Sequence, residues 1–201
     1  RVAEMLQQDG QLYTENYRTA RSTDIYTPAT TGTITWHPTF TFHGFRYVEL
    51  SGLPADAEPT NDWVTGVVLH SAFDSTGTFT SSHELLNQLQ SNIRWGQCGN
   101  FLDIPTDCPQ RNERLGWTGD AQIFCATSLF TYDTHAFWMS WLQSVREEQL
   151  PDGLVPYVVP ETGVNGGSPG WGDVAVIAPW NVYVRTGDRR ALEESYDMMT
   201  R

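Results

Sequence analysis

The hydrophobic pattern changes its period near residue 81, and this change constrains the fold more than any other feature of the sequence. Before it, Thr33–Pro38, Phe40–Leu50 and Trp63–Phe73 alternate or run in β-branched and aromatic residues between glycine-containing turns, as strands do. After it, apolar residues recur at helical spacing. We therefore expect a β-sandwich over residues 1–80 and a helical domain over residues 81–201, an α + β multidomain chain.

Start and stop signals divide the helical part. Ser82 precedes an amphipathic run and Gly96 closes it, so the pair predicts an N-cap and a helix end. Further helices are expected over three segments: Thr118–Tyr132, Asp133–Gln149 and Asp173–Arg185. Asp173 suits the N-cap of its helix better than a ligand. The last expected helix opens at Gly187–Asp188 and has no stop signal, which predicts that the sequence is the middle of a larger protein.

Charge and composition exclude several classes of function. All 12 basic residues are arginine, so the chain has no lysine for Schiff-base chemistry, a pyridoxal-phosphate site or a Walker-type loop. The net charge of −12 argues against a nucleic-acid partner. No apolar run approaches the ~18 residues of a membrane span, so no membrane partner is expected. The first ten residues lack a signal-peptide stretch, so a targeting segment is expected to be absent or removed.

The three cysteines form no recognisable framework. Cys98, Cys108 and Cys125 are irregularly spaced, and neither CxxC nor HExxH occurs. Zinc binding by Cys98, Cys108 and a histidine is the less favoured alternative to buried free thiols. No metal and no cofactor are expected.

The densest group of charged and aromatic residues is TDCPQRNERLGWTGD, residues 106–120. Pro109 and Gly116 predict a loop that leads into a helix. A carboxyl group held beside Trp117 and other carboxylates can act as a general acid, whereas the simpler interpretation is a solvated loop with local ion pairs. The residues alone leave both open. Trp117 and Trp171 lie in glycine-flanked loops, where an indole can stack on a sugar, whereas Trp138 and Trp141 are expected to pack a helix core.

Four segments carry a resemblance to a known family. TDCPQRNERLGWTGDAQ closely resembles the active-site signature of the α-L-rhamnosidases of glycoside hydrolase family 78. FTFHGFRYVELSG resembles a strand pair of the β-sandwich that precedes their catalytic domain. PDGLVPYVVPETG and GWGDVAVIAPWNVYVRTGD resemble the next two segments in the same order. The resemblance extends from about Gln11 to Arg201.

The resemblance implies a fold, a mechanism and a set of site residues. The fold is a β-sandwich followed by the N-terminal portion of an (α/α)6 barrel, and the mechanism is inverting hydrolysis of α-L-rhamnose glycosides or polysaccharides. Glu113 would be the general acid, Trp117 a wall of the pocket, and Trp171 an apolar face for the ring and its C6 methyl. The sugar hydroxyls would bind three residues: Asp107, Arg111 and Asp120.

The sequence departs from the family pattern in two ways. The family's general base and a following histidine lie farther along the barrel than this sequence reaches, so we expect the acid half of a site and no turnover by the 201 residues alone. Asn112 stands where many relatives carry an acid. The alternatives are a six-hairpin glycosidase of other sugar specificity and a non-catalytic carbohydrate-binding protein. Location and oligomeric state stay open.

Overall fold

The computed structural model describes residues 1–201 and divides them into two compact units. The N-terminal unit consists of Arg1–Val68 together with Pro109–Arg114. The helical unit consists of Leu69–Cys108 and Leu115–Arg201. The motif of residues 106–120 is therefore divided: its middle, residues 109–114, belongs to the N-terminal unit, and both of its ends belong to the helical unit.

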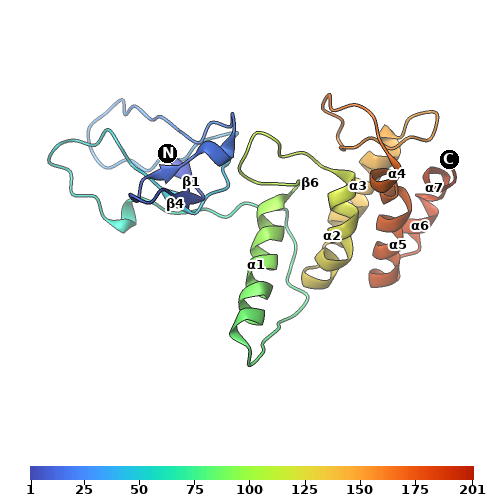
Figure 1. Ribbon diagram of the computed structural model, residues 1–201. Helices are drawn as coiled ribbons and strands as arrows, with labels where there is room; N and C mark the ends of the chain where they lie inside the picture. The colour runs from blue at the N-terminus through green and yellow to red at the C-terminus, as the bar shows by residue number, and fades with distance from the viewer. The chain divides into compact units, whose positions relative to one another are not determined.

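The N-terminal unit contains few strands. β1 (Val2–Ala3) pairs antiparallel with β4 (Tyr47–Val48), and β2 (Met5–Leu6) pairs antiparallel with β3 (Leu12–Tyr13). Two single 3-10 turns complete its regular structure: η1 at Glu15–Tyr17 and η2 at Asn61–Trp63. The first part of the chain is thus β-containing but mostly irregular (Figure 1).

The predicted strands Thr33–Pro38, Phe40–Leu50 and Trp63–Phe73 are wrong as strands. Of their residues only Tyr47–Val48 lies in a ladder, and Trp63 ends η2. A strand exists only where a neighbour takes its N–H and C=O groups, and apart from Tyr47–Val48, which pairs with β1, these segments have no ladder partner within this chain. Their side chains stay exposed as well: Trp36 at 44% and Val67 at 73%.

The helical unit is built on four helices: α1 (Glu84–Asn100), α2 (Thr118–Thr131), α3 (His135–Glu148) and α5 (Val174–Thr186). A short hairpin of β5 (Phe101–Leu102) and β6 (Ile104–Pro105) follows α1, and α4 (Pro169–Gly172) precedes α5. α5 packs against α2 and α3 (Figure 1). The helices predicted over 118–132, 133–149 and 173–185 are confirmed within two residues at each end.

Two predictions about helix ends are wrong. His83 rather than Ser82 is the N-cap of α1, and the helix passes through Gly96 to Asn100. A glycine inside a helix costs only about 1 kcal/mol relative to alanine, so it does not stop a helix by itself. The last segment forms two short helices, α6 (Arg190–Glu193) and α7 (Tyr196–Thr200), instead of one. Asp173 does occupy the N-cap position of α5, although its side chain makes no capping hydrogen bond.

The core of the helical unit is aromatic. Trp138 and Trp141 are 0% and 1% exposed, as predicted. Each indole N–H is satisfied: Trp138 Nε1 donates to Ser128 Oγ at 2.8 Å, and Trp141 Nε1 donates to Val159 O at 3.0 Å. A buried indole needs such a partner, so these two bonds fix how α3 lies on its neighbours.

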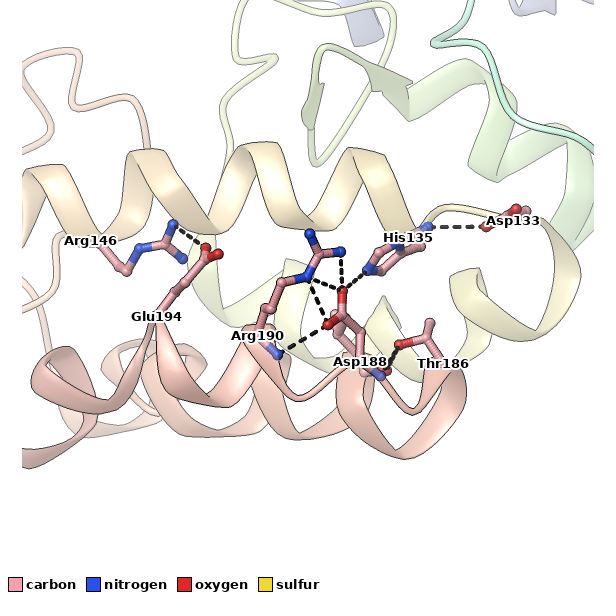
Figure 2. A network of polar contacts seen from close by, with 8 residues as sticks. Asp133, His135, Arg146, Thr186, Asp188, Arg190 and Glu194 are labelled. Carbon is pink, nitrogen blue, oxygen red and sulfur yellow. Dashed lines mark hydrogen bonds and ion pairs between the residues drawn. The ribbon is translucent and has the colours of Figure 1, made fainter.

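A polar network joins the start of α3 to the connection between α5 and α6 (Figure 2). Asp188 Oδ2 lies 2.9 Å from His135 Nε2 and 2.7 Å from Arg190 Nη2. The Arg190 guanidinium holds the pKa of the Asp188 carboxyl well below its usual range. Farther along α3, Arg146 Nη2 donates to Glu194 Oε2 at 3.2 Å.

Several helices also present apolar side chains to solvent. On α1, Leu85 and Trp95 are 72% and 62% exposed, and on α2 Ile123 is 78% exposed. None of the helices combines the length and the apolar character that a membrane-spanning helix requires.

Candidate active site

The loop of residues 107–115, called the motif loop below, leaves and re-enters the helical unit at one place. The Asp107 N–H donates to Leu115 O at 3.1 Å, and Asp107 Oδ1 accepts the Leu115 N–H at 3.0 Å. These two bonds close a nine-residue loop and orient the Asp107 carboxyl by the backbone. The predicted loop before a helix is confirmed, since α2 begins at Thr118.

The residues that lead into α2 run beside a second segment, Pro156–Val159. The Val159 N–H donates to Gly116 O at 2.9 Å, and a side chain at Gly116 would overlap Val159 O. Thr118 is fully buried, and its Oγ1 donates to Pro156 O at 3.1 Å. Trp117 pairs with Val158 in an isolated antiparallel bridge. This pairing fixes Trp117 and the first turn of α2.

Tyr157 connects the two tryptophans that the sequence placed in loops. Its ring centroid lies 6.3 Å from that of Trp117 and 5.5 Å from that of Trp171. Tyr157 was not predicted as a site residue. The available signal was an aromatic residue within the short apolar run PYVVP of a loop.

The Trp171 indole lies on the backbone of α2. A Cβ at Gly119 would come within 2.8 Å of the indole, so only glycine leaves room for it. Gln122 Nε2 donates to Gly170 O at 2.7 Å and ties α4 to α2. A glycine and an amide thus hold Trp171 in place, with its side chain 36% exposed.

A pocket of about 660 Å³ opens in the helical unit beside Trp171. It is lined by α1, the β5–β6 hairpin, α2 and α4, and its lining includes three of the predicted site residues: Asp107, Asp120 and Trp171. Asp120 lies exposed in the first turn of α2, where a carboxylate suits the positive end of the helix dipole. The pocket has the size of a small-molecule site, and it pairs an aromatic face with hydrogen-bonding carboxylates. Trp117 is not among the lining residues.

Arg111 and Glu113 belong to the segment counted with the N-terminal unit. Glu113 Oε2 accepts from Arg111 Nε at 2.9 Å and from Arg18 Nη1 at 3.2 Å. The Glu113 side chain is 22% exposed, so both charge-assisted bonds are partly shielded from solvent. Arg18 follows η1 and was not predicted as a site residue.

Glu4, in the same unit, interacts with Gln110 and Arg111 of this segment. Burial raises the pKa of the Glu4 carboxyl, against a hydrogen bond from Gln110 and the charges of Arg111 and Arg46. Burial, with a contribution from the charge of Glu4, raises the pKa of Tyr17 to about 12. The Tyr17 hydroxyl donates to Gly44 O at 2.7 Å.

The three cysteines all lie in the helical unit, but they do not form a cluster with one another. Cys98 Sγ donates to the Tyr132 hydroxyl at 3.4 Å, and burial raises the pKa of the Cys125 thiol. Both are buried free thiols, which confirms the prediction for these two, and Cys108 is buried as well.

Both parts of the chain match known protein families. Residues 74–201 match the family described as bacterial alpha-L-rhamnosidase 6 hairpin glycosidase domain. Residues 1–70 match the bacterial alpha-L-rhamnosidase concanavalin-like domain.

Individual relatives are similar over nearly the whole chain. An alpha-L-rhamnosidase of Formosa agariphila is 63% identical over 99% of this chain and 22% of its own length. The crystal structure of a Streptomyces avermitilis alpha-L-rhamnosidase complexed with L-rhamnose superposes with a TM-score of 0.96 at 45% identity, over 100% of this chain and 19% of that one. A native Aspergillus terreus enzyme gives 0.93 at 44% identity, over 99% of this chain and 23% of that one. The chain therefore spans about a fifth of the length of these relatives.

Proposed function

We infer the function from the family to which this chain belongs, the bacterial α-L-rhamnosidases. We propose that the chain is part of a longer inverting glycosidase that removes terminal, non-reducing α-L-rhamnose from glycosides or polysaccharides. In this proposal it forms the end of a β-sandwich and the first part of an (α/α)6 barrel, and it supplies the acid half of the active site.

The proposed chemistry assigns the acid role to Glu113. As the bond between the anomeric carbon and the glycosidic oxygen breaks, the leaving oxygen takes the Glu113 proton. A water molecule adds to the opposite face of the anomeric carbon and gives its proton to a carboxylate outside this chain. In inverting enzymes the two carboxyl groups stand roughly 6.5–9.5 Å apart, which leaves room for that water.

The remaining residues bind the sugar in this proposal. Asp107, Arg111 and Asp120 hydrogen-bond the hydroxyl groups of rhamnose, and the carboxylates also stabilise the positive charge that develops on the ring. Trp117 and Trp171 provide indole walls. An indole suits the apolar face of rhamnose and its C6 methyl group.

The observation that carries this proposal is the pocket of the helical unit. Asp107 lies where the motif loop begins, Asp120 in the first turn of α2 and Trp171 in α4, yet all three line one cavity. Further support comes from the Streptomyces avermitilis structure, whose protein is complexed with L-rhamnose.

The test is hydrolysis of p-nitrophenyl α-L-rhamnopyranoside and of a natural rhamnoside by the full-length enzyme and its Glu113→Gln variant. We expect turnover by the parent and a loss on the natural substrate of about a hundredfold or more, typical of a removed general acid. The activated substrate needs less protonation and should lose less. A folded enzyme that is inert on rhamnosides but cleaves other glycosides would overturn the sugar assignment, and a sugar-binding protein without turnover would overturn the enzyme assignment.

A further inference from the structure

The turn formed by residues 16–19, which includes the end of η1, contacts the motif loop at more than one point within the N-terminal unit. Arg18 Nη1 donates to Glu113 Oε2 at 3.2 Å. One residue on, Thr19 Oγ1 accepts from Asn112 Nδ2 at 2.6 Å. Neighbouring residues of the turn therefore hold neighbouring residues of the loop, although 95 positions separate Arg18 from Glu113.

A third contact reaches the loop through Glu4. Asn16 Nδ2 donates to Glu4 Oε2 at 3.4 Å, and Glu4 also accepts a hydrogen bond from the Gln110 side chain. Gly44 lies so close to the loop that a Cβ would come within 2.9 Å of Pro109 Cγ. The loop from 109 to 113 is thus held along its length by the N-terminal unit.

The backbone of Arg18 is set in an unusual conformation. Its φ of 56° and ψ of −117° place a non-glycine residue in a region that L-residues rarely adopt. Such a conformation costs free energy and persists where the surroundings fix it. Here the buried Tyr17 fixes it, because its ring is 1% exposed and its hydroxyl donates to Gly44 O. The strained turn aims the Arg18 guanidinium at the carboxyl.

Two guanidinium groups then share one carboxylate oxygen. Arg111 and Arg18 both donate to Glu113 Oε2, at 2.9 Å and 3.2 Å. Two donors that meet at one oxygen restrict the rotation of the carboxyl group, so the two arginines set its orientation. The two cations also stabilise the carboxylate that remains once the proton has left.

We propose that Arg18 is a positioning residue for the general acid, fixing the orientation in which the Glu113 carboxyl delivers its proton. The proposal rests on the acid role proposed above for Glu113. It adds Arg18, a residue of the N-terminal unit, to the groups that serve protonation of the leaving group. The step that Arg18 assists is the departure of that group.

The test compares two substrates in the full-length enzyme. We measure kcat and KM of Arg18→Met on an alkyl α-L-rhamnoside, whose leaving group needs protonation, and on p-nitrophenyl α-L-rhamnopyranoside, whose leaving group departs as a stable anion. We expect kcat on the alkyl rhamnoside to fall about tenfold, as small misplacements of a catalytic group do, with KM unchanged. On the p-nitrophenyl substrate we expect less than about a twofold loss.

Two further variants support the comparison. Arg21→Met is the matched control, because Arg21 is exposed, lies three residues on and makes no ion pair in the structure; we expect wild-type values on both substrates. Arg18→Lys keeps the charge without the planar fork, and we expect a loss of about threefold on the alkyl rhamnoside alone. If Arg18→Met does not fold, Arg18→Lys decides the question by the same comparison.

An equal loss on both substrates would show that Arg18 merely supports the structure, and it would overturn the proposal, as would an unchanged rate on the alkyl rhamnoside. Failure of the proposed function looks different. A wild-type enzyme that cleaves neither rhamnoside refutes that function, whereas an active wild type, an impaired Glu113→Gln and a normal Arg18→Met refute only the role of Arg18.

Discussion

The two units of the chain carry similar apolar residues but bury them differently. In the N-terminal unit the buried hydrophobic residues are only Val2, Ala3, Leu12 and Tyr17, whereas the helical unit buries whole aromatic and aliphatic side chains, most of them from α2, α3 and α5. A helix satisfies its own backbone, so it forms wherever its pattern occurs, and its apolar face then collects a core. A strand depends on its neighbours. The helical unit is therefore held by packing and the N-terminal unit by individual polar contacts.

The largest expected effect is at the centre of the helical core. Trp138→Ala should destabilise the protein by about 3–5 kcal/mol, because it removes a fully buried indole and leaves a cavity. Chemical unfolding followed by circular dichroism measures this loss. Trp95→Ala is the matched control, because its side chain is 62% exposed, and it should change stability by less than about 0.5 kcal/mol. Equal losses would break the contrast between buried and exposed tryptophans.

A second prediction separates two glycines of the helical unit. Gly116→Ala should cost about 1–3 kcal/mol, because its methyl group would overlap Val159 O and push the two segments apart. Gly96→Ala should stabilise by about 0.5–1 kcal/mol, because Gly96 lies inside α1 with open space around it. Thermal unfolding of both variants checks the signs. A stabilising Gly116→Ala would mean that the 116–159 pairing yields easily.

In the N-terminal unit we expect smaller effects from single contacts. Tyr17→Phe should cost about 1 kcal/mol, the usual net value of one hydrogen bond. The raised pKa of Tyr17 adds a pH dependence. The protonated hydroxyl contributes stability that is fully present below pH 10.0, the ordinary pKa of a tyrosine, and that is lost as the pH rises to about 12, the pKa in the folded protein. The chain has no lysine to titrate in this range.

Denaturant unfolding of wild type and Tyr17→Phe at pH 9 and pH 11 tests this. The variant should lose less stability than the wild type between the two values, and Tyr26→Phe, at an exposed tyrosine of the same unit, should behave as the wild type does. Parallel curves for wild type and Tyr17→Phe would count against a buried, protonated Tyr17.

The smallest expected effect concerns the network of Figure 2. The pKa of Asp188 is lowered by Arg190, so the carboxylate contributes stability above the ordinary pKa of an aspartate, and this is lost as the pH falls through the lowered value. Asp188→Asn should therefore lower the melting temperature slightly at pH 7 and have less effect at pH 3. Melting curves from pH 3 to pH 7 measure this, and Asp197→Asn, at an aspartate without an ion pair, serves as the control. A constant difference across the range would contradict the linkage.

The sequence predicted the parts of the fold and site that depend on local pattern. The helices α2, α3 and α5 follow from periodicity, and the loop before Thr118 follows from Pro109 and Gly116. The strands between residues 33 and 73 failed because β-propensity describes a surface suited to pairing and not the presence of a partner.

Long-range contacts set the limit for the site. Tyr157 and Arg18 reach the motif only because the chain folds back on itself, and no local pattern marks either residue. Trp171 could be proposed from its glycine-flanked position, but its place on Gly119 could not, because a glycine in a helix gives no sign of what will lie on it. Composition and spacing thus identified candidate residues without their neighbours.

The closed loop between Asp107 and Leu115 has a consequence for recombination between relatives. The chain passes from one compact unit to the other at three places, after Val68, Cys108 and Arg114, so the N-terminal unit is not a module that a single crossover can exchange. A chimera joined only near residue 68 would combine Arg18, Gly44 and Glu4 of one parent with residues 109–114 of the other. We expect such hybrids to fold only when residues 109–114 come from the same parent as the first 68 residues. Substitutions in these two stretches of the sequence are therefore expected to be coupled.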